Sequence, residues 1–346
     1  MDAVRVLVAI ALMLVGLPAF AQGWATRDVC DVPEVAVFES AFAPATEDDI
    51  KTAADHMPNG VGRLWRIEAP NGAVSHLWGT MHVTDPRILD LPDRVLDLID
   101  NARVVALEID PIMPSRRAYE RDLRRADWFR NGRSDVDLSD SALPADVLEW
   151  IRQRSHGLGW GRNAPDRLTL GAVAELLLSD PCDDFAAGIL PVQDGRIQML
   201  GMIAGAEILA LEEAMRIKHQ LDGGEGDFAI DFLLVYGSYL NPETKWQDRA
   251  TSFALYLEGR IAEMMAWDRA YVSDVLGDGG RAIDRVNAYL LDARNHAFVD
   301  AAESALQQGG VFIAVGCFHL PGAQGMVALL RERGFTVTRV PVPGEV

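Results

Sequence analysis

Two stretches that end in the same motif organise the sequence: Val74-Ser75-His76-Leu77-Trp78-Gly79-Thr80-Met81-His82 and Val311-Phe312-Ile313-Ala314-Val315-Gly316-Cys317-Phe318-His319. Each is a segment of strand length that runs into Gly-x-x-His. A helical pattern over 92–101 and an apolar strand over 104–110 follow the first motif. A helix over 326–333, a glycine and a strand over 335–340 follow the second. The order Gly-x-x-His, helix, strand therefore occurs twice.

Apolar and polar residues alternate in the preceding segment, 64–68, which Pro70-Asn71-Gly72 joins to the first stretch. Two such segments around a turn predict a β-hairpin. A strand, a helix and a strand in close succession predict a parallel βαβ unit. Helical patterns fill most of 115–300, with one short buried strand predicted at 208–212. We therefore expect an α/β fold with a central mixed, largely parallel sheet, inserted helices, and the two Gly-x-x-His units packed together.

The N-terminus has the pattern of an export signal. An apolar run from Val6 to Leu17 follows Arg5, and Ala19-Phe20-Ala21 is typical of a cleavage site. The run is shorter than the roughly 20 residues of a membrane span. We expect a signal peptide at 1–21, a polar N-terminal arm at 22–60 and a single domain at 61–346. The mature protein would be periplasmic or secreted, without stable membrane insertion; the alternative is one uncleaved anchor helix.

Charge and cysteine content limit the partners and the sites available. The net charge of −19 disfavours nucleic acid and anionic membrane surfaces as partners. Three cysteines are too few, and too widely spaced, for a structural zinc site. An oxidising compartment permits one disulfide, and Cys30–Cys182 is the natural pair because Cys317 lies inside a histidine motif.

Four candidate site residues lie at or just beyond the ends of predicted strands: His82, Glu108, Glu212 and His319. In a parallel sheet, ligands bind at the carboxyl edge, and neighbouring strands are about 4.8 Å apart. Two imidazoles with one or two carboxylates suit a divalent cation of the Mn, Co or Zn type, which would activate water for hydrolysis. Metal-free acid–base work by the histidines remains open. Taken singly, each residue has an ordinary structural explanation, such as a loop hydrogen bond or a solvated strand end.

The motifs resemble the TraB/GumN family, which is related to the Tiki metalloproteases and more distantly to erythromycin esterase and the haem-binding ChaN proteins. The resemblance rests on Leu77–His82, Leu107-Glu108, Leu211-Glu212, Arg294-Asn295 and Gly316–Gly322. It covers roughly 64–342 and implies one α/β domain with a metal-dependent hydrolytic site. Ala206 and Ala210 stand where the family commonly has Lys and Gly, and Cys317 where it has a small residue.

The resemblance implies roles for particular residues. His82, Glu108 and His319 would hold the metal, Glu212 would be a fourth ligand or general base, and Arg294 would stabilise developing negative charge beside Asn295. The first functional hypothesis is therefore an exported hydrolase, a peptidase acting on an extended peptide or other small substrate. The second is a non-catalytic protein that binds a peptide or haem in the same cleft.

Overall fold

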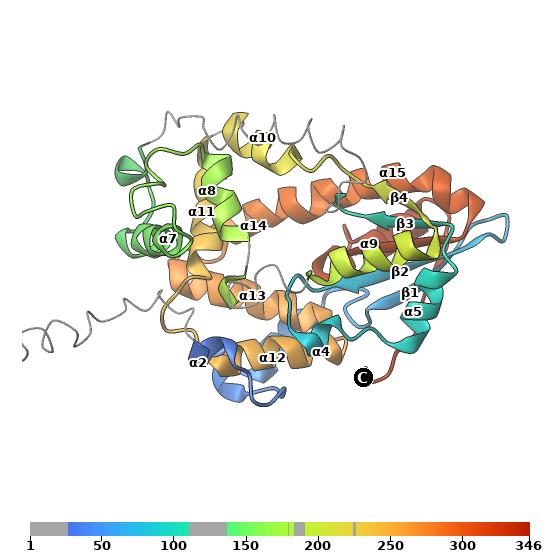
Figure 1. Ribbon diagram of the computed structural model, residues 1–346. Coiled ribbons are helices and arrows are strands. Elements are labelled where there is room, and N and C mark those ends of the chain that lie inside the picture. Colours follow the sequence, from blue (N-terminus) through green and yellow to red (C-terminus); the bar gives the residue numbers. More distant parts are fainter. Residues whose placement is uncertain (1–26, 111–136, 179, 183–190, 224–225) are drawn as a thin grey trace, which may run out of the picture.

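The computed structural model describes residues 27–110, 137–178, 180–182, 191–223 and 226–346. Its sheet has the strand order β4-β3-β5-β2-β1-β6 (Figure 1). In chain order the strands span Leu64–Glu68 (β1), Val74–Thr80 (β2), Val104–Leu107 (β3), Glu207–Ala210 (β4), Val311–Gly316 (β5) and Thr336–Arg339 (β6). The expected signal peptide at 1–21 lies outside the described residues.

The predicted β-hairpin is confirmed. Strands β1 and β2 pair antiparallel with Arg66 opposite His76. The connecting turn places Gly72 at a φ of 85°, a conformation that L side chains rarely adopt. Strand β6 pairs antiparallel with the other side of β1, so the end of the second Gly-x-x-His unit packs against the beginning of the first.

The parallel part of the sheet is also confirmed. Strand β2 pairs parallel with β5, β5 with β3, and β3 with β4. The order is not that of the chain, because β5 lies between β2 and β3. The two strands that end in Gly-x-x-His are therefore immediate neighbours, which brings the two motifs to one point of the sheet.

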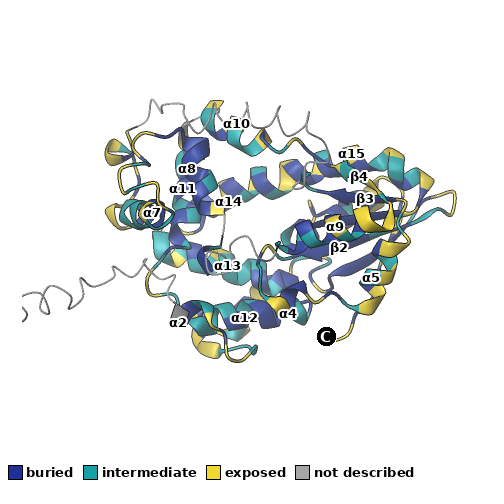
Figure 2. Ribbon diagram, in the orientation of Figure 1, coloured by how far each residue is buried: buried dark blue, intermediate teal, exposed yellow. Residues whose placement is uncertain are grey.

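Helices cover both faces of the sheet, which makes its central strands fully buried (Figure 2). One face carries α5 (Asp93–Asp100) and α9 (Gln193–Ala204), whose apolar side chains pack with Trp78, Val105 and Phe312. The other carries α15 (Arg294–Gln308) and α16 (Met326–Glu332), which pack with Leu77, Ala106 and Ile313. Strands buried on both sides need continuous apolar runs, as the sequence has here.

Strand β4 differs from its prediction. The sequence predicts a buried strand at 208–212, but the strand spans Glu207–Ala210, with Ala210 exposed and Ile208 and Leu209 only half-buried. Leu211 and Glu212, which follow the strand, are buried as predicted. The strand pairs with β3 alone and so forms an edge of the sheet. A short apolar run predicts a strand but does not show whether the strand is central or at an edge of the sheet. The burial of the strand depends on that position.

The inserted region forms a helical lobe beside the carboxyl edge of the sheet (Figure 1). Its helices α7 (Ala145–Gly157), α8 (Leu170–Leu178), α11 (Gly226–Ser238) and α14 (Arg281–Asn287) share one apolar core, which includes Ile151, Val173, Phe232 and Ile283. No helix in the described part of the chain has the length and apolarity needed to cross a membrane. Further helices are α10 (Arg216–Gly223), α12 (Trp246–Leu257) and α13 (Ile261–Leu276). Two short helices are α4 (Pro86–Leu89) and the 3-10 helix η2 (Leu138–Asp140).

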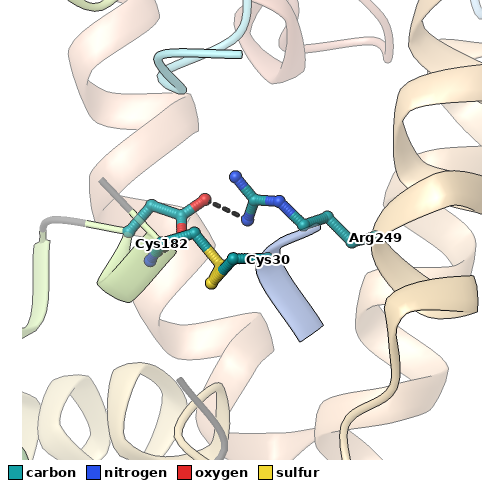
Figure 3. Close-up of a disulfide and its surroundings, with 4 residues drawn as sticks. Cys30, Cys182 and Arg249 are labelled. Carbon is teal, nitrogen blue, oxygen red and sulfur yellow. Dashed lines mark hydrogen bonds and ion pairs between the residues drawn. A yellow bond between two sulfur atoms is a disulfide. The ribbon is translucent and has the colours of Figure 1, made fainter. Parts of the chain in front are cut away.

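The described part of the N-terminal arm packs on α12 and α13 through α2 (Arg27–Cys30), η1 (Glu39–Phe42) and α3 (Glu47–Ala54). A disulfide joins Cys30 to Cys182, with their Cα atoms 5.2 Å apart, as the sequence predicts (Figure 3). Beside it, Arg249 of α12 pairs with Asp180. Cys317 is a buried free cysteine, and burial raises the pKa of its thiol to about 12. A protonated buried thiol is a poor nucleophile, which argues against that role for Cys317.

Candidate functional site

The four predicted strand-end residues gather at the carboxyl edge of the sheet. His82 follows β2, His319 follows β5, Glu108 follows β3 and Glu212 follows β4, so they come from four successive strands. Glu108 Oε1 lies 3.5 Å from His319 Nε2 and 3.9 Å from His82 Nε2. The structure thus brings both motif histidines to the same carboxylate.

The two motif glycines are required by close packing. A Cβ on Gly316 would lie 3.2 Å from Glu108 Oε1 and 3.6 Å from His82 Nε2, and one on Gly79 would lie 3.1 Å from the Cα of Cys317. Neither glycine has a positive φ. A side chain at Gly316 would therefore enter the space where Glu108, His82 and His319 meet.

His319 is held in one tautomer. Asn295 Nδ2 donates to the carbonyl oxygen of Gln324 (2.8 Å), so its Oδ1 faces His319 Nδ1 at 2.7 Å and accepts the Nδ1 proton. Nε2 is then the unprotonated nitrogen, and it lies 3.5 Å from Arg294 Nη1, which donates toward it, and 3.5 Å from Glu108 Oε1. Burial of the ring, which is almost complete, lowers the pKa of His319 to about 4. A neutral imidazole of fixed tautomer is the form that coordinates metals or accepts a proton.

Glu108 remains ionised although it is largely buried. Burial opposes its charge, but His319, Arg294 and His82 and the Gly316 N–H hold its pKa well below the ordinary value. Gly316 donates to Oε1 at 2.7 Å and Arg294 Nη2 donates to Oε2 at 2.6 Å. Oε1 is the oxygen that faces the histidines, so the charge is directed at the candidate site.

Arg294 links Glu108 to Glu212. It follows a π-helical turn (Ala288–Ala293), and its Nε and Nη2 donate to Glu212 Oε1 at 2.8 and 2.5 Å. Burial disfavours the guanidinium charge, but the two carboxylates outweigh it and raise the pKa of Arg294. Glu212 contacts neither histidine in these bonds; its carboxylate anchors Arg294. π-turns are rare and often occur at functional sites, and this one places the arginine between two strand ends.

Asp194 is a site residue that the sequence analysis did not identify. Its Oδ2 lies 3.2 Å from His82 Nε2, and its Oδ1 accepts a hydrogen bond from Thr80 Oγ1 at 3.0 Å. The Asp194 charge raises the pKa of His82 to about 9, although half of the His82 ring is exposed. An aspartate in the first turn of a helix is common for reasons of helix stability alone, so the sequence held no signal that singled it out.

A buried network fixes the helix that carries Asp194. The preceding residue, Gln193, accepts hydrogen bonds on Oε1 from Trp78 Nε1 (3.2 Å) and Tyr256 Oη (2.9 Å), and donates from Nε2 to the Ile88 carbonyl (2.5 Å). Tyr256 Oη is also 2.9 Å from the carbonyl oxygen of Gly79. The start of α9 is therefore locked to the first Gly-x-x-His motif.

The donor atoms suit a divalent cation, although the cluster is not a finished metal site. Four groups meet here: the Nε2 atoms of His82 and His319, Glu108 Oε1 and Asp194 Oδ2. Asp194 Oδ2 is buried, and the described group nearest to it in these contacts is His82 Nε2, 3.2 Å away. Among the described residues, however, no three His, Cys, Asp or Glu side chains are arranged to hold a metal ion as they stand.

Comparison with known proteins gives one result. Residues 63–339 match the TraB/PrgY/gumN family, from the residue before β1 to the end of β6. A search of curated proteins found no significant match, and a search of solved structures found none either. The family match spans most of the chain and includes both Gly-x-x-His motifs, Glu108, Glu212 and the Arg294-Asn295 pair. The chain belongs to the TraB/PrgY/gumN family.

Proposed function

We propose that the protein is an exported, metal-dependent hydrolase that acts on peptides. The observation that carries this proposal is the convergence of His319 Nε2 and His82 Nε2 on Glu108 Oε1, at 3.5 and 3.9 Å. Ligand atoms bound to one ion at about 2.0–2.2 Å in tetrahedral geometry lie at about 3.3–3.6 Å from one another. A small rotation of the half-exposed His82 ring would complete such a shell.

His82, His319 and Glu108 would hold the ion, with Asp194 Oδ2 as a fourth oxygen. When bound, a divalent cation lowers the pKa of a coordinated water and polarises a carbonyl group. The chain's own contribution is to keep the donors in place: Asn295 fixes the His319 tautomer, and the Gly316 N–H and Arg294 orient Glu108. Arg294 also brings a fixed positive charge to the edge of the site, where it would stabilise a developing oxyanion.

Replacing Glu108 by glutamine tests the hydrolase proposal. The change keeps the shape of the side chain but removes the charge that faces both histidines, so we expect peptide hydrolysis to fall by a factor of a hundred or more. The measurement is cleavage of a quenched fluorescent peptide library by the mature protein supplied with Mn²⁺, Co²⁺ or Zn²⁺. Glu207→Gln, at the exposed start of β4, is the matched control and should cleave as the parent does. A Glu108→Gln variant with parental activity would refute the proposed role.

Export is supported by the apolar N-terminal run and by the disulfide between Cys30 and Cys182, a bond that persists in oxidising compartments. We expect the protein recovered from the periplasm or the medium to begin at Gln22. Mass spectrometry of the intact protein and of its N-terminal peptide measures this directly. Retention of Met1 on membrane-bound protein would favour the uncleaved anchor.

A further inference from the structure

A second recognition element lies beside the candidate site. A cavity of about 550 Å³ opens between the end of β4, helix α10 and the π-helical turn, and its lining includes Glu212, Glu213, Arg216, Gln220 and Tyr289. A cavity of this size accommodates a side chain or the end of a peptide. It is separated from Glu108 by one guanidinium, because Arg294 contacts both Glu108 Oε2 and Glu212 Oε1. The cavity and the candidate site are therefore neighbours on the two sides of Arg294.

Glu212 presents an unused acceptor at this cavity. Its side chain is only 1% exposed, and its Oε1 takes both hydrogen bonds from Arg294. Its Oε2 is buried and has no hydrogen-bond partner among the residues that the structure describes. The cation next to Oε2, Arg216 Nη1, is 3.9 Å away, which is beyond hydrogen-bond distance. A buried carboxylate oxygen without a donor is unfavourable, so a ligand that supplies an N–H at this position gains from making the bond.

The charges around the cavity favour a cation. The lining has two carboxylates, Glu212 and Glu213, and one guanidinium, Arg216, while Arg294 behind Glu212 is shared with Glu108. The Arg216 side chain is 42% exposed, so solvent screens its charge more than that of Glu212, and His219 also lines the cavity. The half-buried Tyr289 also lines the cavity, and an aromatic ring is a favourable neighbour for an alkylammonium chain.

We propose that this cavity binds a primary ammonium group of the substrate, which donates a hydrogen bond to Glu212 Oε2. The group belongs either to the free N-terminus of a peptide or to a lysine side chain. The inference rests on the proposed function, because it names what the same site selects in a peptide. It makes Glu212 a specificity residue in addition to the anchor of Arg294.

The test is calorimetric titration with short peptides in metal-free buffer that contains EDTA. Two matched pairs separate the two sources of ammonium: Gly-Leu-amide against acetyl-Gly-Leu-amide, and acetyl-lysine-amide against acetyl-norleucine-amide. We expect one ammonium-bearing member to bind at least tenfold more tightly than its neutral counterpart. Equal binding within both pairs would overturn the proposal.

Two substitutions with opposite expected effects make the assignment to Glu212 specific. Glu212→Gln should abolish the preference for the ammonium-bearing peptide. Arg216→Gln should strengthen that preference severalfold, because it removes the competing cation, and its exposed position makes it compatible with folding even if Glu212→Gln is not. Weaker ammonium binding by Arg216→Gln would contradict the proposal and indicate recognition of a carboxylate instead.

The outcome is separable from that of the hydrolase proposal. His82→Ala should lose metal binding yet keep the ammonium preference, since His82 does not line the cavity. Ammonium selectivity in a protein that binds no metal would leave the cavity assignment intact and refute only the metal-dependent function. A protein that binds metal but shows no ammonium selectivity would refute only the cavity assignment.

Discussion

Arg294→Met is expected to destabilise the fold by about 3–5 kcal/mol, because it leaves two buried carboxylates without their shared cation. The Arg294 side chain is 7% exposed, and it donates to both Glu108 and Glu212 at 2.5–2.8 Å. Neither carboxylate can recover its hydration without opening the carboxyl edge of the sheet. Urea unfolding followed by circular dichroism measures the change in free energy.

Arg269→Met is the matched control for this prediction. Arg269 also holds a carboxylate by two bonds, to Asp284 at 2.7 and 2.8 Å, but both side chains are about half exposed. An exposed pair contributes only about 0–1 kcal/mol. If the two substitutions cost the same free energy, burial is not what makes the Arg294 network important, and the account of the site's electrostatics is wrong.

Loss of the disulfide is the second large effect. The bond closes a loop with a sequence separation of 152 residues and ties the N-terminal arm to the helical lobe. A cross-link over so long a loop restricts the unfolded chain strongly, and removing a native disulfide costs on the order of 2–5 kcal/mol. We expect Cys30→Ser, Cys182→Ser and the double variant to be destabilised to the same extent, as measured by urea unfolding.

Reduction supplies the control for the disulfide. The parent protein treated with dithiothreitol should unfold at the same urea concentration as the serine variants, whereas the variants should not respond to reduction. Cys317→Ala tests the third cysteine, which is buried and unpaired. Its unfolding should retain the full dependence on dithiothreitol. A parent protein that unfolds identically with and without reductant would show that Cys30 and Cys182 are not joined in solution.

The sequence predicted most of the sheet because its signals are local. The hairpin has a turn and two alternating strands, and the runs that became β3 and β5 are apolar throughout. The order of strands was not predictable in this way. That β5 separates β2 from β3, and that β4 is an edge, follow from pairings between segments far apart in the chain. Burial of Ile208 and Leu209 depended on that order, and its prediction failed for this reason.

The candidate site was predictable where chemistry and position coincide at a strand end. His82, Glu108, Glu212 and His319 satisfied both conditions, and the structure places all four at one edge. Asp194 has the chemistry but not the position, because it lies in the first turn of a helix that reaches the site from the face of the sheet. The partner of each histidine also depends on three-dimensional packing. Asp194, and not Glu212, contacts His82, and Asn295 contacts His319.

Metal binding by the His82→Ala variant tests whether the two motif histidines are ligands of one divalent cation. His319 is buried against Asn295 and Phe298, so its replacement would disturb packing as well as ligation. The half-exposed His82 ring can be removed with little effect on the fold. The measurement is calorimetric titration of the metal-free mature protein with Mn²⁺, Co²⁺ and Zn²⁺, beside the exposed control His56→Ala. We expect the parent and the control to bind one ion per chain, and the His82→Ala variant to lose at least about tenfold in affinity for that ion. Absence of binding of all three ions by the parent, or equal affinity in His82→Ala, would contradict this expectation.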